Sequence, residues 1–132
     1  MSSNSLGDTG EALAREYLEE QGLQCCTQQY HSQGGEIDLI CYDATSDTYV
    51  LVEVKSRRSR RYGQLQESIT RQKIARMLHA AERYFLTELE RQEVPYFRID
   101  IVFIDYSGDT PIIDWLPNIA LEDESTGSSR PG

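Results

Sequence analysis

Three charged residues stand inside two apolar runs of the sequence, in a pattern that suits hydrolytic chemistry. Asp38 interrupts the run EIDLI, and Glu53 and Lys55 interrupt the valine-rich run VLVEVK. Hard cations such as Mg²⁺ and Mn²⁺ take oxygen ligands, typically one or two carboxylates completed by waters and phosphate oxygens. A nearby lysine can position the attacking water or offset charge on a phosphate. The pattern predicts phosphodiester hydrolysis, with Asp38, Glu53 and the Val54 carbonyl as metal ligands and Lys55 as a catalytic residue.

A β-hairpin over residues 36–55 would bring these side chains together. Two runs of strand-forming residues, 36–42 and 49–55, flank the polar turn DATSDT. Because the turn is short, we expect the two strands to pair in the antiparallel sense. The natural register sets Tyr42 opposite Tyr49.

This register places four charges on one face of the hairpin. Asp38 falls opposite Glu53, and Glu36 falls opposite Lys55. Side chains alternate between faces, so the other face is expected to be a core surface made of Ile37, Leu39, Cys41, Val50, Val52 and Val54. Two opposed carboxylates, roughly 5 Å apart at Cβ, repel unless a cation or a proton lies between them. The alternative is a solvated hairpin face, on which opposite charges commonly pair.

A further acid is expected to approach the hairpin from a helix. Residues 6–21 predict that helix, with Asp8 or Thr9 as N-cap and Gly22 as its stop. Its apolar face is marked by Ala14 and Leu18. Glu11 falls on the same face, where it could hold a second ion or an outer-shell water. The alternative is a capping box in which Glu11 only closes the helix end onto Asp8.

The rest of the chain predicts further α and β elements. Residues 70–90 predict a second helix, whose apolar stripe consists of Ile74, Met77, Leu78, Ala81 and Phe85. A third strand is expected in YFRIDIVFID, and TPIIDWLPNIALE could add a short edge strand. We interpret QGLQCCTQQYHSQGG, between the first helix and the hairpin, as a turn.

Length and composition favour one domain in the cytoplasm. We place this domain at residues 1–121 of the 132, followed by a disordered tail at residues 122–132. The sequence shows no signal-peptide pattern and no apolar run long enough to span a bilayer, so no membrane partner is expected. The spacing of the cysteines fits neither a disulfide framework nor a zinc site, which predicts buried thiols at Cys25, Cys26 and Cys41.

Basic residues are concentrated in one segment of an acidic chain. The net charge is −9, yet residues 55–76 contain eight Lys or Arg residues and one acid. A basic patch on an acidic body restricts contact with a polyanion to one face. We therefore expect this segment to bind nucleic-acid phosphates through Arg57, Arg58, Arg60, Arg61, Arg71, Lys73 and Arg76. The alternative is a solvated loop followed by a charged helix start.

The motifs GEIDLI and LVEVKSR, with GDTGEALAREYLEEQG before them and FRIDIVFID and WLPNIAL after them, resemble a known family. This family is the small bacterial YraN-like proteins, which are predicted nucleases of the restriction-endonuclease-like PD-(D/E)xK superfamily and are similar to archaeal Holliday-junction resolvases. The resemblance covers residues 6–121. It implies an α/β, restriction-endonuclease-like fold in which α-helices flank a central mixed β-sheet.

The resemblance also implies roles for individual residues. Asp38 would be the metal aspartate, Glu53 the second ligand and Lys55 the catalytic lysine. Glu11 would complete the site, and Lys73 falls where related nucleases place a helix residue that contacts DNA or the site.

The activity implied is that of a Mg²⁺- or Mn²⁺-dependent nuclease. Its substrate would be DNA, including branched or recombination intermediates, and a homodimer would suit paired cleavage. Two alternatives stay open: a non-catalytic nucleic-acid-binding or scaffold protein that retains the fold, and a protein–protein module.

Overall fold

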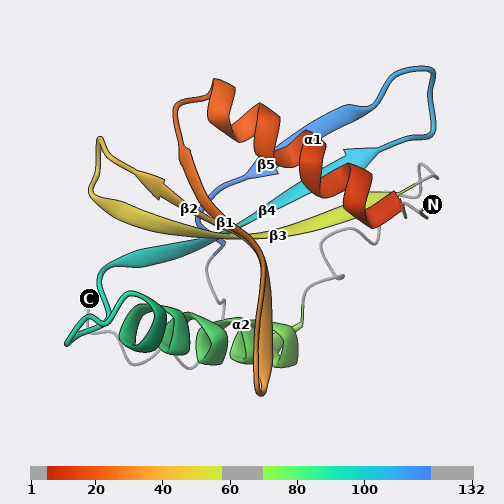
Figure 1. Ribbon diagram of the computed structural model, residues 1–132. Coiled ribbons are helices and arrows are strands. Elements are labelled where there is room, and N and C mark those ends of the chain that lie inside the picture. Colours follow the sequence, from red (N-terminus) through yellow and green to blue (C-terminus); the bar gives the residue numbers. More distant parts are fainter. Residues whose placement is uncertain (1–5, 58–69, 120–132) are drawn as a thin grey trace, which may run out of the picture.

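The computed structural model describes residues 6–57 and 70–119, and within these ranges two helices enclose a single five-stranded sheet (Figure 1). The elements are α1 (Leu6–Glu20), β1 (Gln24–Ser32), β2 (Gly35–Asp43), β3 (Thr48–Arg57), α2 (Arg71–Arg83), a π-helical turn (Tyr84–Glu88), β4 (Phe97–Asp105) and β5 (Ile112–Leu116). The strand order in the sheet follows the chain, β1-β2-β3-β4-β5. Only β3 and β4 pair in parallel, so the described sheet is mixed and the α/β prediction is confirmed.

The two helices cover opposite faces of the sheet (Figure 1). Leu18 of α1 belongs to a buried cluster with Val50 and Val52 of β3. Met77 of α2 belongs to a second buried cluster, with Leu51 on the other face of the same strand. The hairpin therefore has two core faces. The prediction of a single core face was wrong because α2 covers the face that also carries the charges.

Residues 24–32 form β1, where the sequence had indicated a turn. The strand lies at one edge of the sheet and exposes most of its polar side chains, so it lacks the apolar alternation by which strands are recognised. The β1–β2 hairpin bends from the α1 side of the sheet toward α2 (Figure 1). In consequence Ile37 packs in the α2 cluster, although Leu39 packs in the α1 cluster, and the prediction of a common face for the two was wrong.

The turn and register of the β2–β3 hairpin agree with the prediction. Tyr42 is the partner of Tyr49, and the antiparallel pairing extends from Asp43–Thr48 to Leu39–Val52. Asp43 fixes the turn, because its Oδ1 accepts hydrogen bonds from the Thr45 backbone N–H at 3.0 Å and from the Thr45 hydroxyl at 2.6 Å.

The ends of α1 follow local sequence signals only in part. The helix begins at Leu6, so Asp8 and Thr9 lie inside it and the predicted N-caps were wrong. At its C-terminal end Gly22 has φ of +107°, and the Leu23 N–H bonds to the Leu18 carbonyl at 3.0 Å. Gly22 is therefore the predicted stop, in the left-handed conformation that glycine adopts readily.

The helix α2 is shorter than predicted. Thr70 caps its N-terminus by accepting a hydrogen bond from the Lys73 N–H at 3.0 Å, and a π-helical turn replaces the α-helix from Tyr84 onward. Leu78 was predicted in the apolar stripe but is 37% exposed, because Ala80 and Tyr84 fill the adjoining positions against the sheet. None of the described helices is long and apolar enough to cross a membrane. The proposed tail at 122–132 lies outside the described residues.

Candidate functional site

Asp38 lies where the β2–β3 ladder ends, and its carboxylate bridges the two strands. One residue beyond the Leu39–Val52 pair, its Oδ2 accepts a hydrogen bond from the Val54 backbone N–H at 2.8 Å. On the other side of β2, the register with β1 places Gln29 opposite Asp38, and Gln29 has φ of +54°. The Asp38 carboxylate therefore lies between the end of the β2–β3 ladder and a distorted part of β1.

Glu53 lies one residue before Val54 on β3 and is 3% exposed. Its Oε2 lies 3.3 Å from the Lys55 Nζ, since residues two apart on a strand share a face. Its Oε1 lies 3.5 Å from the Nζ of Lys73, which reaches it from α2. Two ammonium groups therefore flank a buried carboxylate.

Glu11 points into the protein from α1. It is 8% exposed and shares the buried face of the helix with Ala14 and Leu18. Since α1 begins at Leu6, Glu11 is an interior residue of the helix, and the capping-box alternative was wrong. A Cβ at Gly10 would overlap the Ser56 hydroxyl of β3, so the small residue lets α1 approach the sheet beside the site.

The acids of the site influence one another electrostatically. Burial raises the pKa of Asp38 to about 6; the Val54 N–H and Lys73 oppose this shift, while Glu11 adds to it. Burial, followed by the charge of Asp38, also raises the pKa of Glu53, and Lys73 and Lys55 lower it in part. Glu11, Asp38 and Glu53 therefore form one electrostatic unit, whose negative charge favours a bound cation or proton.

Lys73 also contacts a second strand. Its Nζ lies 3.3 Å from Oε2 of Glu36 on β2, while His31 Nδ1 lies 3.6 Å from Oε1 of the same carboxylate. The predicted Glu36–Lys55 pairing was wrong, because the described β2–β3 ladder stops before reaching these residues. We refer to the joint set as the charge cluster: Glu11, Glu36, Asp38, Glu53, Lys55 and Lys73.

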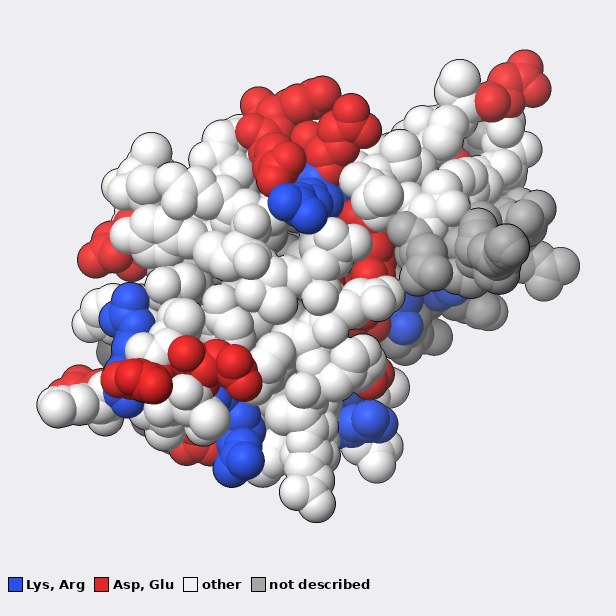
Figure 2. Space-filling model, viewed as in Figure 1, with Lys and Arg blue, Asp and Glu red and all other residues white. Residues whose placement is uncertain are grey.

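The predicted nucleic-acid-binding residues fall into four groups. Lys73 is half-buried in the charge cluster, whereas Arg71 and Arg76 are exposed on α2 and Arg57 is half-buried at the end of β3. The remaining residues of the set lie outside the described ranges: Arg58, Arg60 and Arg61. On the opposite side of the sheet, Figure 2 shows acidic side chains over α1, where Glu16, Glu19 and Glu20 are exposed. Contact with a polyanion is thus favoured away from this part of α1.

The donor set suits a hard cation, although no preformed cage surrounds one. In residues 6–57 and 70–119, no group of three or more His, Cys, Asp or Glu side chains is arranged to hold a metal ion. Mg²⁺ commonly uses only one or two carboxylates and keeps its waters, and the oxygens of Asp38 and Glu53 meet that requirement. The Val54 N–H is engaged by Asp38, while the role predicted for the Val54 carbonyl stays a prediction.

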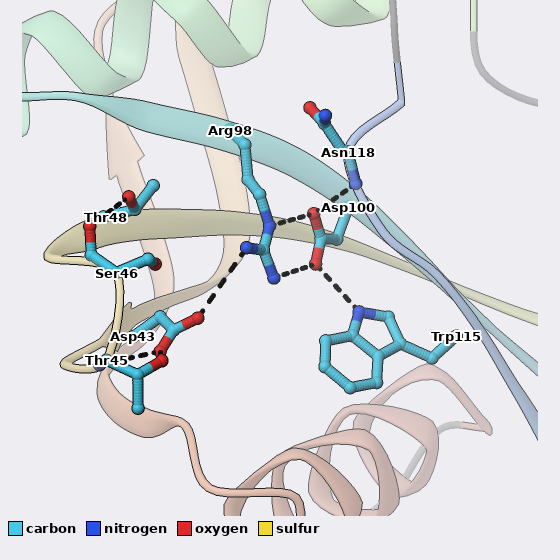
Figure 3. Close-up of polar contacts among 8 residues, drawn as sticks. All are labelled: Asp43, Thr45, Ser46, Thr48, Arg98, Asp100, Trp115 and Asn118. Atoms are coloured by element: carbon cyan, nitrogen blue, oxygen red, sulfur yellow. Dashed lines mark hydrogen bonds and ion pairs between the residues drawn. The ribbon is translucent and has the colours of Figure 1, made fainter.

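Two buried acids outside the site, Asp100 and Asp105, were not identified from the sequence, and Asp100 is the more fully buried of the two. Asp100 of β4 is fully buried, and its carboxylate accepts hydrogen bonds from Arg98 at 3.0 and 3.3 Å, from Trp115 Nε1 at 2.8 Å and from the Asn118 N–H at 2.8 Å (Figure 3). Arg98 continues to Asp43 at 3.8 Å. Asp100 thus accepts hydrogen bonds from Arg98 of β4, from Trp115 of β5 and from Asn118, two residues beyond β5. These bonds join the three segments and indicate a structural role.

Comparison with known proteins shows that the charge cluster lies within a length of chain that matches a known family. The model of the uncharacterised protein family UPF0102 matches residues 10–104, which include every cluster residue. A UPF0102 protein of Herpetosiphon aurantiacus is 37% identical over 124 residues, covering 89% of this chain and 95% of that protein. One from Cupriavidus metallidurans is 39% identical over 130 residues, covering 96% and 91%. One from Vibrio cholerae serotype O1 is 36% identical over 122 residues, covering 92% and 97%.

Proposed function

The chain belongs to the uncharacterised protein family UPF0102, and we propose that it is a metal-dependent nuclease that hydrolyses phosphodiester bonds in DNA. The observation that carries the proposal is the buried Glu53 carboxylate between Lys55 and Lys73, next to the Asp38 carboxylate at the end of the ladder. Buried acids with raised pKa values beside lysines are typical of catalytic sites. The fold proposed with this activity is the restriction-endonuclease-like one, which the mixed sheet between two helices supports.

Asp38 and Glu53 would hold Mg²⁺ or Mn²⁺, together with the Val54 carbonyl. The ion, when bound, would polarise the phosphoryl group and lower the pKa of a coordinated water. Glu11 lies on the α1 side of the same electrostatic unit and would orient an outer water or a second ion. The backbone N–H of Val54 fixes the Asp38 carboxylate in place, so its second oxygen can face the cation.

The lysines supply the positive charge that a phosphate needs. Lys55 sits on the face of β3 that carries Glu53, and its ammonium would orient the attacking water and offset charge on the phosphate. Lys73 would exchange its contact with Glu53 for a contact with the substrate when the acids bind the cation. Substrate binding would then be coupled to release of the Lys73 ammonium from Glu53.

Phosphate contacts would come from the basic residues at the end of β3 and on α2. Arg57, Arg71 and Arg76 are the described members of this set, and Arg58, Arg60 and Arg61 continue it in sequence. Contacts of this type bind the backbone and carry little base specificity. Branched or recombination intermediates are the proposed DNA substrates, and a homodimer would suit paired cuts.

A second function is favoured by one observation. Lys55 and Lys73 both contact Glu53 and offset part of its charge. A non-catalytic nucleic-acid-binding protein with this fold would keep that arrangement. It would bind with a steep dependence on salt concentration, and the binding would need no divalent ion and would survive Glu53→Gln.

The deciding experiment incubates the purified full chain with Mg²⁺ or Mn²⁺ and with duplex, single-stranded and branched DNA, and with RNA. We expect cleavage of at least one DNA structure, abolished by Glu53→Gln and by Lys55→Met. Glu20→Gln, on the exposed side of α1, is the matched control and should cleave as the wild type does. Circular dichroism checks that the variants fold. Absence of cleavage by the wild type under all these conditions would reject the nuclease function.

A further inference from the structure

Cys25 of β1 and Cys41 of β2 are direct partners across antiparallel strands, and their Sγ atoms lie 3.0 Å apart. Directly opposite residues in such a pair have Cα atoms about 4.5–5.5 Å apart, which falls within the range of about 4.4–6.8 Å that a disulfide spans. An S–S bond of about 2.05 Å therefore requires a small side-chain rotation and no movement of the backbone. Both residues are free thiols in this structure.

We propose that Cys25 and Cys41 form a redox modification site that a hydroperoxide oxidises to a disulfide joining β1 to β2. In the first step the Cys25 thiolate attacks the peroxide, the O–O bond breaks, and Cys25 becomes a sulfenic acid while the peroxide is reduced to water or an alcohol. In the second step the Cys41 sulfur attacks the Cys25 sulfur. Hydroxide leaves with the proton of the Cys41 thiol, as water. One hydroperoxide thus takes two electrons from two thiols.

The surroundings of the two sulfurs assign their order of reaction. Cys25 is half-buried, whereas Cys41 is fully buried in the cluster beneath α1. A small peroxide therefore reaches Cys25 first. The hydrogen bond with Cys41 lowers the pKa of the Cys25 thiol, and Arg15 of α1 adds to the lowering; burial and Glu19 oppose it. The more accessible sulfur is thus the better nucleophile of the two, and the buried one is the resolving thiol.

The neighbouring cysteine provides an internal control. Cys26 is exposed, and its Sγ donates to the Gln24 carbonyl at 3.7 Å, whereas the Sγ atoms of Cys25 and Cys41 contact each other. Exposure of Cys26 contradicts the prediction that all three cysteines are buried. The register shifts between Cys25 and Thr27, so Cys26 is the extra residue of a β-bulge, and in the described pairing it is Cys25 that lies opposite Cys41.

The test treats the reduced, folded full chain of three variants with hydrogen peroxide: Cys26→Ser, Cys25→Ser and Cys41→Ala. We expect Cys26→Ser to lose the mass of two hydrogen atoms and both of its alkylatable thiols, and dithiothreitol should restore them. The oxidised form should melt several degrees higher than the reduced form, because the bond closes a loop between residues 16 positions apart. Cys25→Ser and Cys41→Ala should form no intramolecular disulfide.

Two results would overturn the proposal. The first concerns a peroxide concentration that oxidises Cys26 in the Cys25→Ser variant. If the Cys26→Ser variant keeps both of its thiols at that concentration, the Cys25–Cys41 pair has no special reactivity. The second is a Cys25→Ser protein that forms a disulfide as fast as Cys26→Ser does. Near-ultraviolet circular dichroism of each reduced variant establishes that the strands are paired before oxidation. Should Cys25→Ser fail this check, Cys25→Ala replaces it, because alanine is tolerated at a half-buried apolar contact.

Discussion

The Nζ atom of Lys73 lies 3.5 Å from Oε1 of Glu53, so the first turn of α2 is tied to the middle of the sheet by charge. The same ammonium lies 3.3 Å from Glu36 on the neighbouring strand. The side chain of Glu53 is 4% exposed and that of Lys73 is 21% exposed. Since water screens this pair only weakly, the lysine is a resident counter-ion for the acids, and any divalent ion at Asp38 and Glu53 must compete with it.

Lys73→Met is expected to lower the free energy of unfolding of the metal-free protein by about 2 kcal/mol, because it leaves buried acids with less positive charge beside them. Lys55 still contacts Glu53, which keeps the loss below that of an isolated buried pair. Removal of the competing ammonium should also make Mg²⁺ raise the melting temperature more than in the wild type. Urea unfolding in chelator and thermal melts with Mg²⁺ measure the two effects.

Arg76→Met is the matched control for this prediction. Arg76 lies on the same helix and is exposed, so its loss should change stability by no more than about 0.5 kcal/mol. Equal stabilities for Lys73→Met and Arg76→Met would show that the Lys73 contacts contribute nothing measurable.

Asp38 should make the metal-free protein less stable as pH rises. Its pKa is raised from the ordinary 3.8 to about 6 on folding. Between these values the folded chain holds a proton that the unfolded chain has lost, so stability falls through this window and stays low above it. Asp38→Asn removes the effect and keeps an acceptor for the Val54 N–H. The variant should therefore gain about 2 kcal/mol over the wild type between about pH 4 and pH 7.

Urea unfolding at several pH values, in chelator, measures this difference. Asp109→Asn, at an exposed position beyond β4, is the control and should follow the wild-type profile. Mg²⁺ should restore stability to the wild type at pH 7 and leave Asp38→Asn nearly unchanged. If the wild type and Asp38→Asn lose stability in parallel across this range, the carboxyl of Asp38 does not titrate as described.

The parts of the site that the sequence could predict depend on local geometry. Tyr42 and Tyr49 flank a short polar turn, and their pairing fixes a register that ends at Leu39–Val52, one pair before the predicted opposition of Asp38 and Glu53. The charge of Asp38 still raises the pKa of Glu53. Helical spacing alone directed Glu11 toward the core beside Leu18. In both cases the relevant residues are close in sequence, so periodicity and turn chemistry are sufficient.

The parts that could not be predicted depend on contacts between distant elements. The resemblance implied that Lys73 contacts DNA or the site, but no local pattern predicts its contacts with Glu36 and Glu53. They arise because the chain between the parallel strands β3 and β4 carries α2 across the face of the sheet. Asp100 collects donors from β4, β5 and the residue Asn118, none of which is marked by a local motif. The sequence did not predict β1 as a strand, because an edge strand can be polar at most of its positions.

Asp100→Asn is expected to lower the free energy of unfolding by about 2–4 kcal/mol, independently of metal. The substitution keeps the shape of the side chain but places an NH₂ group where the carboxylate accepted from Arg98, Trp115 and Asn118, and it leaves the half-buried Arg98 without a full counter-charge (Figure 3). Asp114→Asn, at an exposed position of β5, is the control and should stay within about 0.5 kcal/mol of the wild type. A matching loss in both variants, measured in urea, would contradict the structural role of Asp100.

Gly35→Ala should separate β2 from α2 and so disturb the charge cluster without touching a charge. A Cβ at position 35 would overlap the Arg76 carbonyl oxygen, which is backbone and cannot rotate away, and would crowd the Ala80 methyl at 3.2 Å. Relief of the overlap requires α2 to shift, which costs about 2–3 kcal/mol of stability and moves Lys73 away from Glu36. Gln33→Ala, exposed in the same hairpin, is the control and should leave both properties unchanged. A stable Gly35→Ala protein, with the same response to Mg²⁺ as the wild type, would show that the close approach of β2 to α2 is not needed to position Lys73.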